Sequence, residues 1–308
     1  MKESVISLLI MVIMAGIHSF LFAACSPIKP SEQSDSYLSD RSNSFLIFDH
    51  SHSEFDFLLK KNVYKEWVNY EGFLSEIELF YRYVDKLGKV DSHILATWTR
   101  EQKLAFWINA YNAFTLQAIM ERYPIKGRSL IGLFFPQSSI LQIPGIWSRI
   151  KFKAGGKKVT LGQIEHKIIR KLFDEPRIHF AIVCASRSCA NLRDEAYQAN
   201  ILEKQLHEQA VRFINDPSNG VRWDRDNHRL HISKIFKWFK KDFEKKDIST
   251  GSSTRSIKSS QPVLRFIRQY IRNKEAIDWI DRGRDIRVSY LPYDWHLNDK
   301  AEKPRMDN

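Results

Sequence analysis

The sequence predicts a single α/β domain of the α+β type, rich in helix and packed on a short central sheet. Two observations support this class. Long stretches of the 308-residue chain carry apolar residues three and four positions apart, which is the period of an amphipathic helix. One continuous apolar run, Ile178 to Cys184, is typical of a strand buried on both faces. The chain is also long enough for one domain of about 250 residues with a sizeable core, or for two small domains.

Residues 1–24 have the pattern of a bacterial secretion signal, with a charged start, an apolar run and small residues before Cys25. A Cys directly after Ala-Ala resembles the lipobox of bacterial lipoproteins, in which the Cys is acylated after cleavage. Phe22 stands where that motif usually has Leu. An uncleaved membrane anchor and simple secretion are the alternatives. The prediction is a protein of the cell envelope, lipid-anchored through Cys25 in the outer membrane and facing the periplasm.

The rest of the chain divides by composition. Residues 25–53 are rich in Ser, Asp and Pro and are predicted to be a flexible tether. Residues 54–298 form the predicted globular domain. Within it, a Ser-rich loop at 249–261 is expected to be mobile, because it has almost no apolar residue to bury. Residues 299–308 form a charged tail.

The first predicted helix spans 55–87, where apolar residues recur at helical spacing. A second, strongly apolar helix spans 103–123. Thr99 to Gln102 matches a capping box before it, and Pro124 cannot continue it. Trp107 in this helix is expected to lie in the core.

Two amides of the second helix, Asn109 and Asn112, lie three positions apart and so share one face. A buried amide is costly without hydrogen-bond partners. The pair therefore either hydrogen-bonds a loop or lines a pocket, and the sequence leaves both roles open.

Residues 124–158 are predicted to be irregular or hairpin-like, because prolines and Gly155-Gly156 interrupt them. Thr160 to Gln163 is a second capping-box match, and it opens a helix that runs through Phe173. The predicted apolar stripe of this helix consists of Leu161, Ile164, Ile168 and Leu172.

Three polar side chains accompany that stripe. Glu165 borders it, and a carboxylate on the rim of an apolar face is either paired or functional. His166 and Arg170 share a neighbouring face of the same helix. They are candidates for a site.

After the strand at 178–184, the pattern predicts a helix over 193–214, a hairpin over 221–232 and helices over 233–246 and 262–280. The densest basic run lies in 233–246, with aromatic residues at 236, 239 and 243. Lysine stems over an aromatic stripe are more typical of an amphipathic helix packed on the core than of a nucleic-acid platform.

The chain carries a formal net charge of +12. Outside the cytoplasm such an excess favours anionic lipid headgroups, acidic glycans or cell-wall polymer as partners. The predicted partners are therefore the membrane, through the lipidated N-terminus, and an envelope protein or an anionic glycan or lipid. Nucleic acid is not predicted.

The strand ending in Cys184 delivers a thiol into a polar, basic loop that also holds Cys189. Cys184 is the candidate nucleophile of a hydrolase or acyltransferase, with His166 or His179 as base and Glu165 or one of the helix amides as its orienting partner. Alternation along a regular strand favours His166, and a bulge would restore His179. Arg187, Arg193 and a helix beginning near 193 would lower the pKa of the thiol.

The leading interpretation is instead an envelope-anchored module that presents a basic, aromatic surface and a Cys/His pocket to a partner or glycan. In that interpretation Cys184 and Cys189 form a disulfide that staples the loop. A metal site made of both cysteines and one or two histidines is disfavoured by the Cys-x4-Cys spacing. No metal and no cofactor are predicted.

Five segments resemble, in order, the domain of unknown function 547 family over roughly residues 95–298. They are Phe106-Trp-Ile-Asn-Ala-Tyr-Asn112, Leu161-Gly-Gln-Ile-Glu-His166, Pro176 to Ser186 with Ser188-Cys189, Phe236 to Phe243, and Leu291-Pro-Tyr-Asp-Trp-His-Leu-Asn298. The family usually has Asn where Val183 stands and Pro where Ala190 stands. The resemblance implies a shared fold and a candidate site but no substrate.

Overall fold

The computed structural model describes residues 48–127, 135–244, 262–282 and 286–302. The predicted signal, nearly all of the tether and the Ser-rich loop lie outside these residues. The chain from His50 onward forms one compact unit. Among the described residues, no helix is long and apolar enough to cross a membrane.

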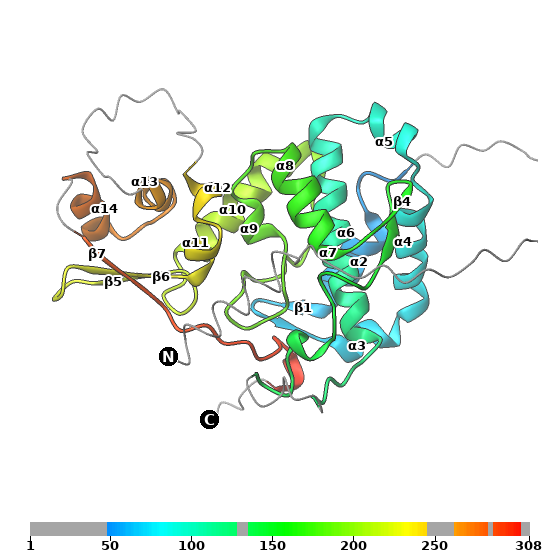
Figure 1. Cartoon of the computed structure of the whole chain (residues 1–308), viewed down its shortest axis with the longest axis horizontal. Coiled ribbons are helices and arrows are strands. Elements are labelled where there is room, and N and C mark those ends of the chain that lie inside the picture. The colour runs from blue at the N-terminus through cyan, green and yellow to red at the C-terminus, as the bar shows by residue number, and fades with distance from the viewer. Residues whose placement is uncertain (1–47, 128–134, 245–261, 283–285, 303–308) are drawn as a thin grey trace, which may run out of the picture. The chain divides into compact units, whose positions relative to one another are not determined.

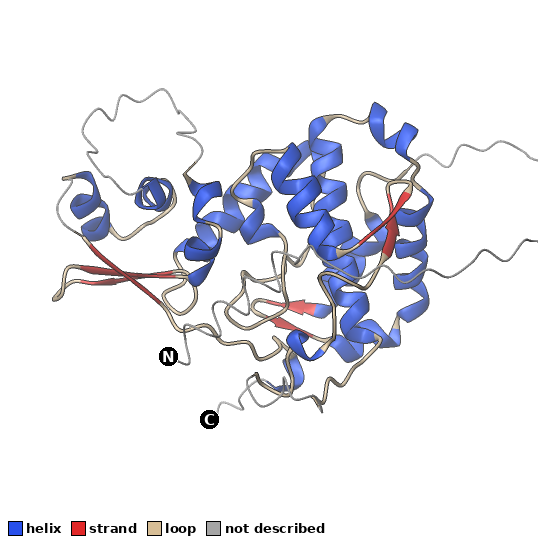
Figure 2. Cartoon of the chain, in the orientation of Figure 1, coloured by secondary structure: helices blue, strands red, loops and turns tan. Residues whose placement is uncertain are grey.

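The helix-rich α/β class is confirmed, and in the part of the chain that the structure describes the β-structure is distributed over three small sheets (Figure 2). The first half of the unit consists mainly of helices, with a short hairpin at their edge (Figure 1). In order these elements are α2 (Ser53–Asn62), β1 (Val63–Tyr64), β2 (Trp67–Val68), α3 (Tyr70–Ser75), α4 (Ile77–Lys89), α5 (Ser92–Thr97) and α6 (Arg100–Met120).

The single helix predicted over 55–87 is wrong, because the β1–β2 hairpin interrupts it. The chain reverses at Lys65, whose φ of 56° lies in the left-handed region. The flanking Val and aromatic residues favour paired strands over a continued helix. The sequence shows helical spacing on both sides of this reversal, so periodicity alone does not reveal it.

Helix α6 lies in the core and is buried on nearly every side. Thr99 and Gln102 form both hydrogen bonds of the predicted capping box. Trp107 is 3% exposed, as expected of a core residue. Because this helix has no solvent-facing stripe, its polar side chains must find partners inside the protein.

The hairpin predicted near Gly155-Gly156 is formed by β3 (Phe152–Ala154) and β4 (Lys157–Val159). Both glycines have positive φ, 57° and 75°, which is why glycine suits this turn. A 3₁₀ turn, Ile140–Gln142, precedes the hairpin.

The helix predicted over 160–173 is present, but its middle is a π-helix. It consists of α7 (Leu161–Gln163), the π-segment Ile164–Ile169 and α8 (Arg170–Leu172). The wider π-turn rotates the following residues relative to a regular α-helix. The predicted apolar stripe is therefore wrong at its last position. Leu172 is 66% exposed, and Phe173 is buried in its place.

The strand predicted over 178–184 is also wrong. Ile178–Ala181 form a short helix, α9, and the chain becomes extended only at Ile182. A short helix enclosed by other elements buries all its side chains, so it gives the same continuous apolar run as a buried strand. Phe180 shows the enclosure, since its ring packs against those of Phe213 and Phe236.

The helix predicted over 193–214 begins later than expected. A 3₁₀ turn at Ala199–Ile201 leads into α10 (Leu202–Ile214), and residues 191–198 are irregular. The backbone of Tyr197 is not helical and is bound by the side chain of Asn109. This interaction joins residues far apart in the chain, so the local sequence does not predict it.

The last part of the unit combines a small sheet with four short helices. The hairpin predicted over 221–232 is present and pairs in parallel with a third strand that the sequence pattern does not predict. The predicted helices over 233–246 and 262–280 are each divided in two. The elements are β5 (Val221–Asp224), β6 (Arg229–Ile232), α11 (Lys234–Trp238), α12 (Lys240–Phe243), α13 (Pro262–Arg268), α14 (Lys274–Asp281), β7 (Arg287–Tyr290) and a 3₁₀ turn at Lys300–Glu302.

A hydrophobic cluster joins α9 and α10 to this last part. Phe236 and Phe243, 1% and 3% exposed, belong to it, and Phe239 packs against its edge. The aromatic residues of the basic segment therefore face the core, as their spacing predicts, while lysines 237, 240 and 241 are exposed.

Candidate functional site

Cys184 lies in a tight turn that directly follows α9. Asn112 on α6 holds the approach to this turn: its amide donates to the carbonyl of Ala181 and accepts from the backbone N–H of Val183, at 2.9 and 3.0 Å. Ala185, the next residue after the thiol, has φ of 59°, a conformation that costs a non-glycine residue free energy. Such strain is held only where the surroundings impose it.

Residues 294–298 hold Ala185 in this conformation. The N–H groups of Arg187 and Asn298 bind the carbonyls of His296 and Ala185, at 2.9 and 3.0 Å, so the two stretches run side by side. Ser188 adds a side-chain contact, accepting from the N–H of Asp294 at 2.9 Å. Residues more than one hundred positions apart thus fix the turn that carries the thiol.

The thiol of Cys184 is half-buried and surrounded by hydrogen-bond donors. Its Sγ lies 3.2 Å from the hydroxyl of Ser186 and 3.4 Å from that of Tyr293. The thiol of Cys189 also hydrogen-bonds it and is the largest cause of a lowered Cys184 pKa, to about 6. Ser186 and Tyr293 lower it further, against the effect of burial.

Cys189 is the complementary partner in this pair. It is 6% exposed, and its Sγ accepts the backbone N–H of Cys184 at 3.2 Å. The hydrogen bond to Cys184 and burial both raise the pKa of Cys189 well above its usual value. Within this pair the environment favours the thiolate at Cys184 and the protonated thiol at Cys189, and both cysteines are free.

Aromatic rings form a wall beside the thiol. The ring of Tyr293 lies 4.8 Å from that of Trp238 and 4.6 Å from that of Trp295, measured between centroids. Burial raises the pKa of Tyr293 well above its usual value, and the charge on Cys184 adds to this, so its hydroxyl stays protonated as a donor. The Nε1 of Trp238 has no hydrogen-bond partner among the described residues.

Glu165, on the π-segment, lies inside the protein at 3% exposure. It accepts from the hydroxyl of Tyr111 at 3.3 Å, and Tyr111 in turn accepts from Nε1 of Trp147 at 3.2 Å. Burial raises the pKa of Tyr111 well above its usual value, and the charges of Glu165 and Cys184 contribute. This carboxylate and the thiol therefore act on a common neighbour, Tyr111.

The two candidate histidines gather around Asp242 on α12, and Nδ1 of His166 also lies 3.8 Å from Oε1 of Glu165, its predicted partner. His179 lies 2.8 Å from Asp242, and Arg170 binds the same carboxylate through two nitrogens, at 2.5 and 3.1 Å. Arg170 also donates to Nδ1 of His166 at 2.8 Å. Burial lowers the pKa of His179 despite the hydrogen bond to Asp242, so its ring is neutral near pH 7.

Among the described residues, no hydrogen bond joins Cys184 to His166 or His179. The predicted thiol–imidazole pair is therefore not assembled in this conformation. Strand alternation does not apply, because His179 lies on a helix and Cys184 in the turn that follows it.

The predicted sources of positive charge also lie elsewhere. Arg187 lies over the ring of Trp67, 5.3 Å from its centroid, and binds Glu302. Arg193 pairs with Glu195 and Glu208, and no helix begins near it. The thiol's pKa is lowered by neutral donors rather than by these cations.

The sequence leaves two roles open for Asn109 and Asn112, and the structure shows that both hydrogen-bond the backbone of other segments. Asn112 holds the approach to Cys184, and Asn109 holds both backbone groups of Tyr197, at 2.8 and 3.0 Å. Within the described segments, no group of three or more His, Cys, Asp or Glu is placed to hold a metal ion.

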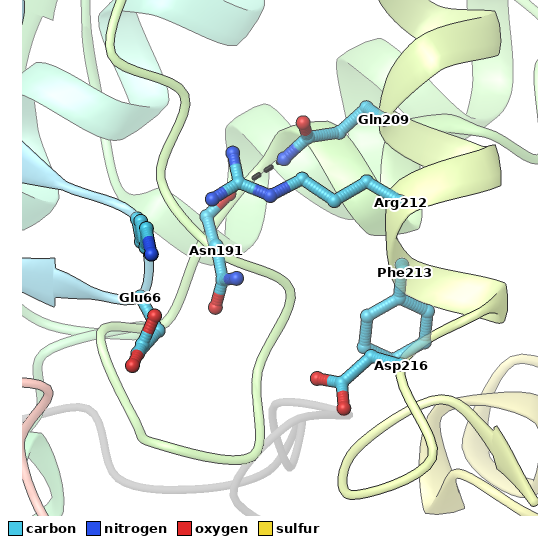
Figure 3. Close-up of a pocket in the computed structure, with 7 residues that line it drawn as sticks. Glu66, Asn191, Gln209, Arg212, Phe213 and Asp216 are labelled. Carbon is cyan, nitrogen blue, oxygen red and sulfur yellow. Dashed lines mark hydrogen bonds between the residues drawn. The ribbon is translucent and has the colours of Figure 1, made fainter.

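Two neighbouring cavities lie along α10, which contributes residues to the lining of both. One, of about 230 Å³, is bordered by Asn191, Gln209 and Arg212, with the β1–β2 turn opposite (Figure 3). The other, of about 560 Å³, shares Gln209 and Arg212 and adds Arg272 among its lining residues. Gln209 donates to the carbonyl of Asn191 at 2.6 Å, which fixes the wall between helix and loop.

Sequence reasoning missed several residues of these clusters. Three of them, Tyr111, Asp242 and Tyr293, lie within segments that carry the family resemblance. The resemblance could therefore have pointed to them. Ser186 lies between the two cysteines. Reading polar residues within those segments as a group, rather than Cys and His alone, would have found them.

Comparison with known proteins adds one match. Residues 95–214 match the family model described as "Protein of unknown function, DUF547". No curated protein and no solved structure matches the chain.

Proposed function

Because residues 95–214 match the DUF547 family, whose description leaves the activity open, we propose from the site itself that the protein is a thiol-dependent acyltransferase or hydrolase with Cys184 as nucleophile. The observation that carries this proposal is the half-buried thiol held by the donors of Cys189, Ser186 and Tyr293. A thiolate is the reactive form of cysteine, and these donors supply it near pH 7 without a histidine base.

The chemistry requires two steps. The Cys184 thiolate attacks the carbonyl carbon of an ester or thioester, the S–C bond forms, and the bond to the leaving group breaks. The leaving group takes its proton from solvent. Water or an acceptor nucleophile then cleaves the thioester and returns the thiolate. The wall of Trp238 and Tyr293 favours a substrate with an apolar acyl group or a flat ring.

The test is acylation by p-nitrophenyl acetate, followed by peptide mass spectrometry. We expect one acetyl group on Cys184 near pH 7, removable by hydroxylamine as a thioester should be. Cys184→Ser should abolish it. The matched control is Cys25→Ser, which should keep it. Equal acylation of the Cys184→Ser variant, or none in the unaltered protein, would contradict the proposal.

A second candidate function is binding of an anionic envelope glycan at the cavities along α10. Arg212 and Arg272 line the larger cavity, and among the described residues neither takes part in a salt bridge. Two unpaired guanidinium groups at one cavity favour carboxylate or phosphate ligands. This candidate preserves the envelope-module interpretation of the sequence.

Binding of polygalacturonate, measured by calorimetry, tests this second candidate. Arg212→Ala should weaken binding about tenfold or more, since a charged hydrogen bond is lost. Lys204→Ala is the control, because it removes the same charge from the same helix outside the cavity. Equal weakening in both variants would indicate non-specific attraction to a basic surface.

We also propose that Cys25 is lipidated and that the domain is held at the outer membrane, facing the periplasm. The proposal is supported by the signal-like N-terminus and the Ala-Ala-Cys sequence. Labelling of cells with an alkyne fatty acid should mark the protein, and Cys25→Ser should remove the label. Label retained in that variant would exclude lipidation at Cys25.

A further inference from the structure

We propose that Cys184 and Cys189 are a redox-active pair, in which Cys184 reduces a hydroperoxide and Cys189 converts the product to an intramolecular disulfide. The redox chemistry differs from acyl transfer, because Cys189 takes part in it as a second reacting thiol and not only as a hydrogen-bond donor to Cys184. Three features of the turn support it: contact between the two cysteines, their unequal exposure and their different environments.

Contact comes first. The N–H of Cys184 donates to Sγ of Cys189 at 3.2 Å, which places the Cys189 sulfur directly against the backbone of Cys184. Both are nevertheless free. A disulfide of about 2.05 Å therefore requires the Cys184 sulfur to approach a sulfur atom that already contacts its own backbone.

Unequal exposure sets the order of reaction. Cys184 is half-buried, whereas Cys189 is 6% exposed. A peroxide arriving from solvent therefore meets Cys184 first. The hydroxyl groups of Ser186 and Tyr293 lie 3.2 and 3.4 Å from the Cys184 sulfur and favour its thiolate, and Ser186 also donates to the hydroxyl of Tyr293 at 3.0 Å. Cys189 remains a protonated thiol behind it, in the position of a resolving cysteine.

The two thiols supply both electrons that the peroxide takes up. The Cys184 thiolate attacks one oxygen of the hydroperoxide, an S–O bond forms and the O–O bond breaks. The alcohol, or water from hydrogen peroxide, leaves after taking a proton, and Cys184 becomes a sulfenic acid. The Cys189 sulfur then displaces that hydroxyl, which leaves as water with the proton of Cys189. A dithiol reductant returns both residues to thiols and is itself oxidised to a disulfide.

The experiment uses the full chain, reduced and then exposed to hydrogen peroxide with dimedone present as a trap for sulfenic acid. Peptide mass spectrometry reports Cys25, Cys184 and Cys189 separately. In the unaltered protein we expect a Cys184–Cys189 disulfide and little dimedone adduct, with Cys184 oxidised about tenfold or more faster than free cysteine at pH 7. Dithiothreitol should reverse the change.

Variants separate the two roles. Cys189→Ser should leave the sulfenic acid unresolved, so dimedone adduct accumulates on Cys184. Cys184→Ser should leave Cys189 reduced. Persistent dimedone adduct on Cys184 in the unaltered protein, or first oxidation at Cys189, would overturn the proposal. Acylation of Cys184 without peroxide sensitivity would overturn it while leaving the acyl-transfer function standing.

Discussion

At the scale of single residues, the thiol of Cys184 depends on neutral hydrogen-bond donors. Ser186 and Tyr293 lie within 3.4 Å of its sulfur, and both stabilise the thiolate relative to the thiol. The predicted cationic helpers are engaged elsewhere. The reactivity of this site is therefore expected to respond to removal of a single hydroxyl group.

Tyr293→Phe removes one such hydroxyl and should raise the pKa of Cys184 above about 6. The rate of alkylation by iodoacetamide should therefore fall at pH 6–7 and converge with that of the unaltered protein at high pH, where both thiols are ionised. Tyr290→Phe is the matched control, because this exposed ring lies in the same segment away from the thiol. Identical pH profiles for all three proteins would exclude the role assigned to Tyr293.

At the scale of secondary-structure elements, Asp242 on α12 binds two other helices of the chain. It contacts His179 on α9 and Arg170 on α8, and through Arg170 it reaches His166 on the π-segment. Burial raises the pKa of Asp242, but hydrogen bonds from His179 and Arg170 outweigh it and hold the pKa well below its usual range. The cluster thus links the π-containing helix to the last part of the unit.

Asp242→Asn should lower the free energy of unfolding at pH 7 by about 2 kcal/mol, as expected when hydrogen bonds to a charged group are lost. A depressed carboxyl pKa stabilises the folded state fully above the unfolded value of about 3.9, and this contribution is lost progressively as pH falls from that value toward the lower pKa of the folded state. The difference from the unaltered protein should therefore shrink from pH 5 toward pH 3 in urea denaturation. The exposed Asp226→Asn variant should show no such pH dependence.

At the scale of the whole molecule, the site is assembled from distant parts of the chain. The family match ends at residue 214, yet Tyr293 and the segment that fixes the Cys184 turn lie beyond it. Helix α6 connects these parts, because it supplies Asn112 to the turn and forms much of the core. Stability of the core and placement of the thiol therefore depend on the same helix.

Trp107→Ala tests the core role of α6. We expect a loss of about 3–5 kcal/mol in the free energy of unfolding, because a large ring that is 3% exposed leaves a cavity. The control is Phe57→Ala, whose ring is 50% exposed and whose removal should change stability by about 0.5 kcal/mol or less. Chemical denaturation measures both, and a neutral Trp107→Ala result would remove Trp107 from the core.

The sequence by itself determined the features that depend on neighbouring residues. Both capping boxes form as predicted at Thr99 and Thr160, the hairpin at Gly155-Gly156 is present, and the basic segment turns its aromatic rings inward. Each follows from interactions within a few positions, which the local pattern contains. The candidate turn around Cys184 was also located from the sequence.

Only the tertiary structure decided what surrounds that thiol. An apolar run cannot distinguish a buried strand from an enclosed helix. Asn112 and the segment ending in Asn298 hold the end of α9 and the turn in place. The π-turn and the placement of His179 against Asp242 likewise follow from packing between distant elements. Such contacts join residues tens to hundreds of positions apart, so no local rule of spacing could assign them.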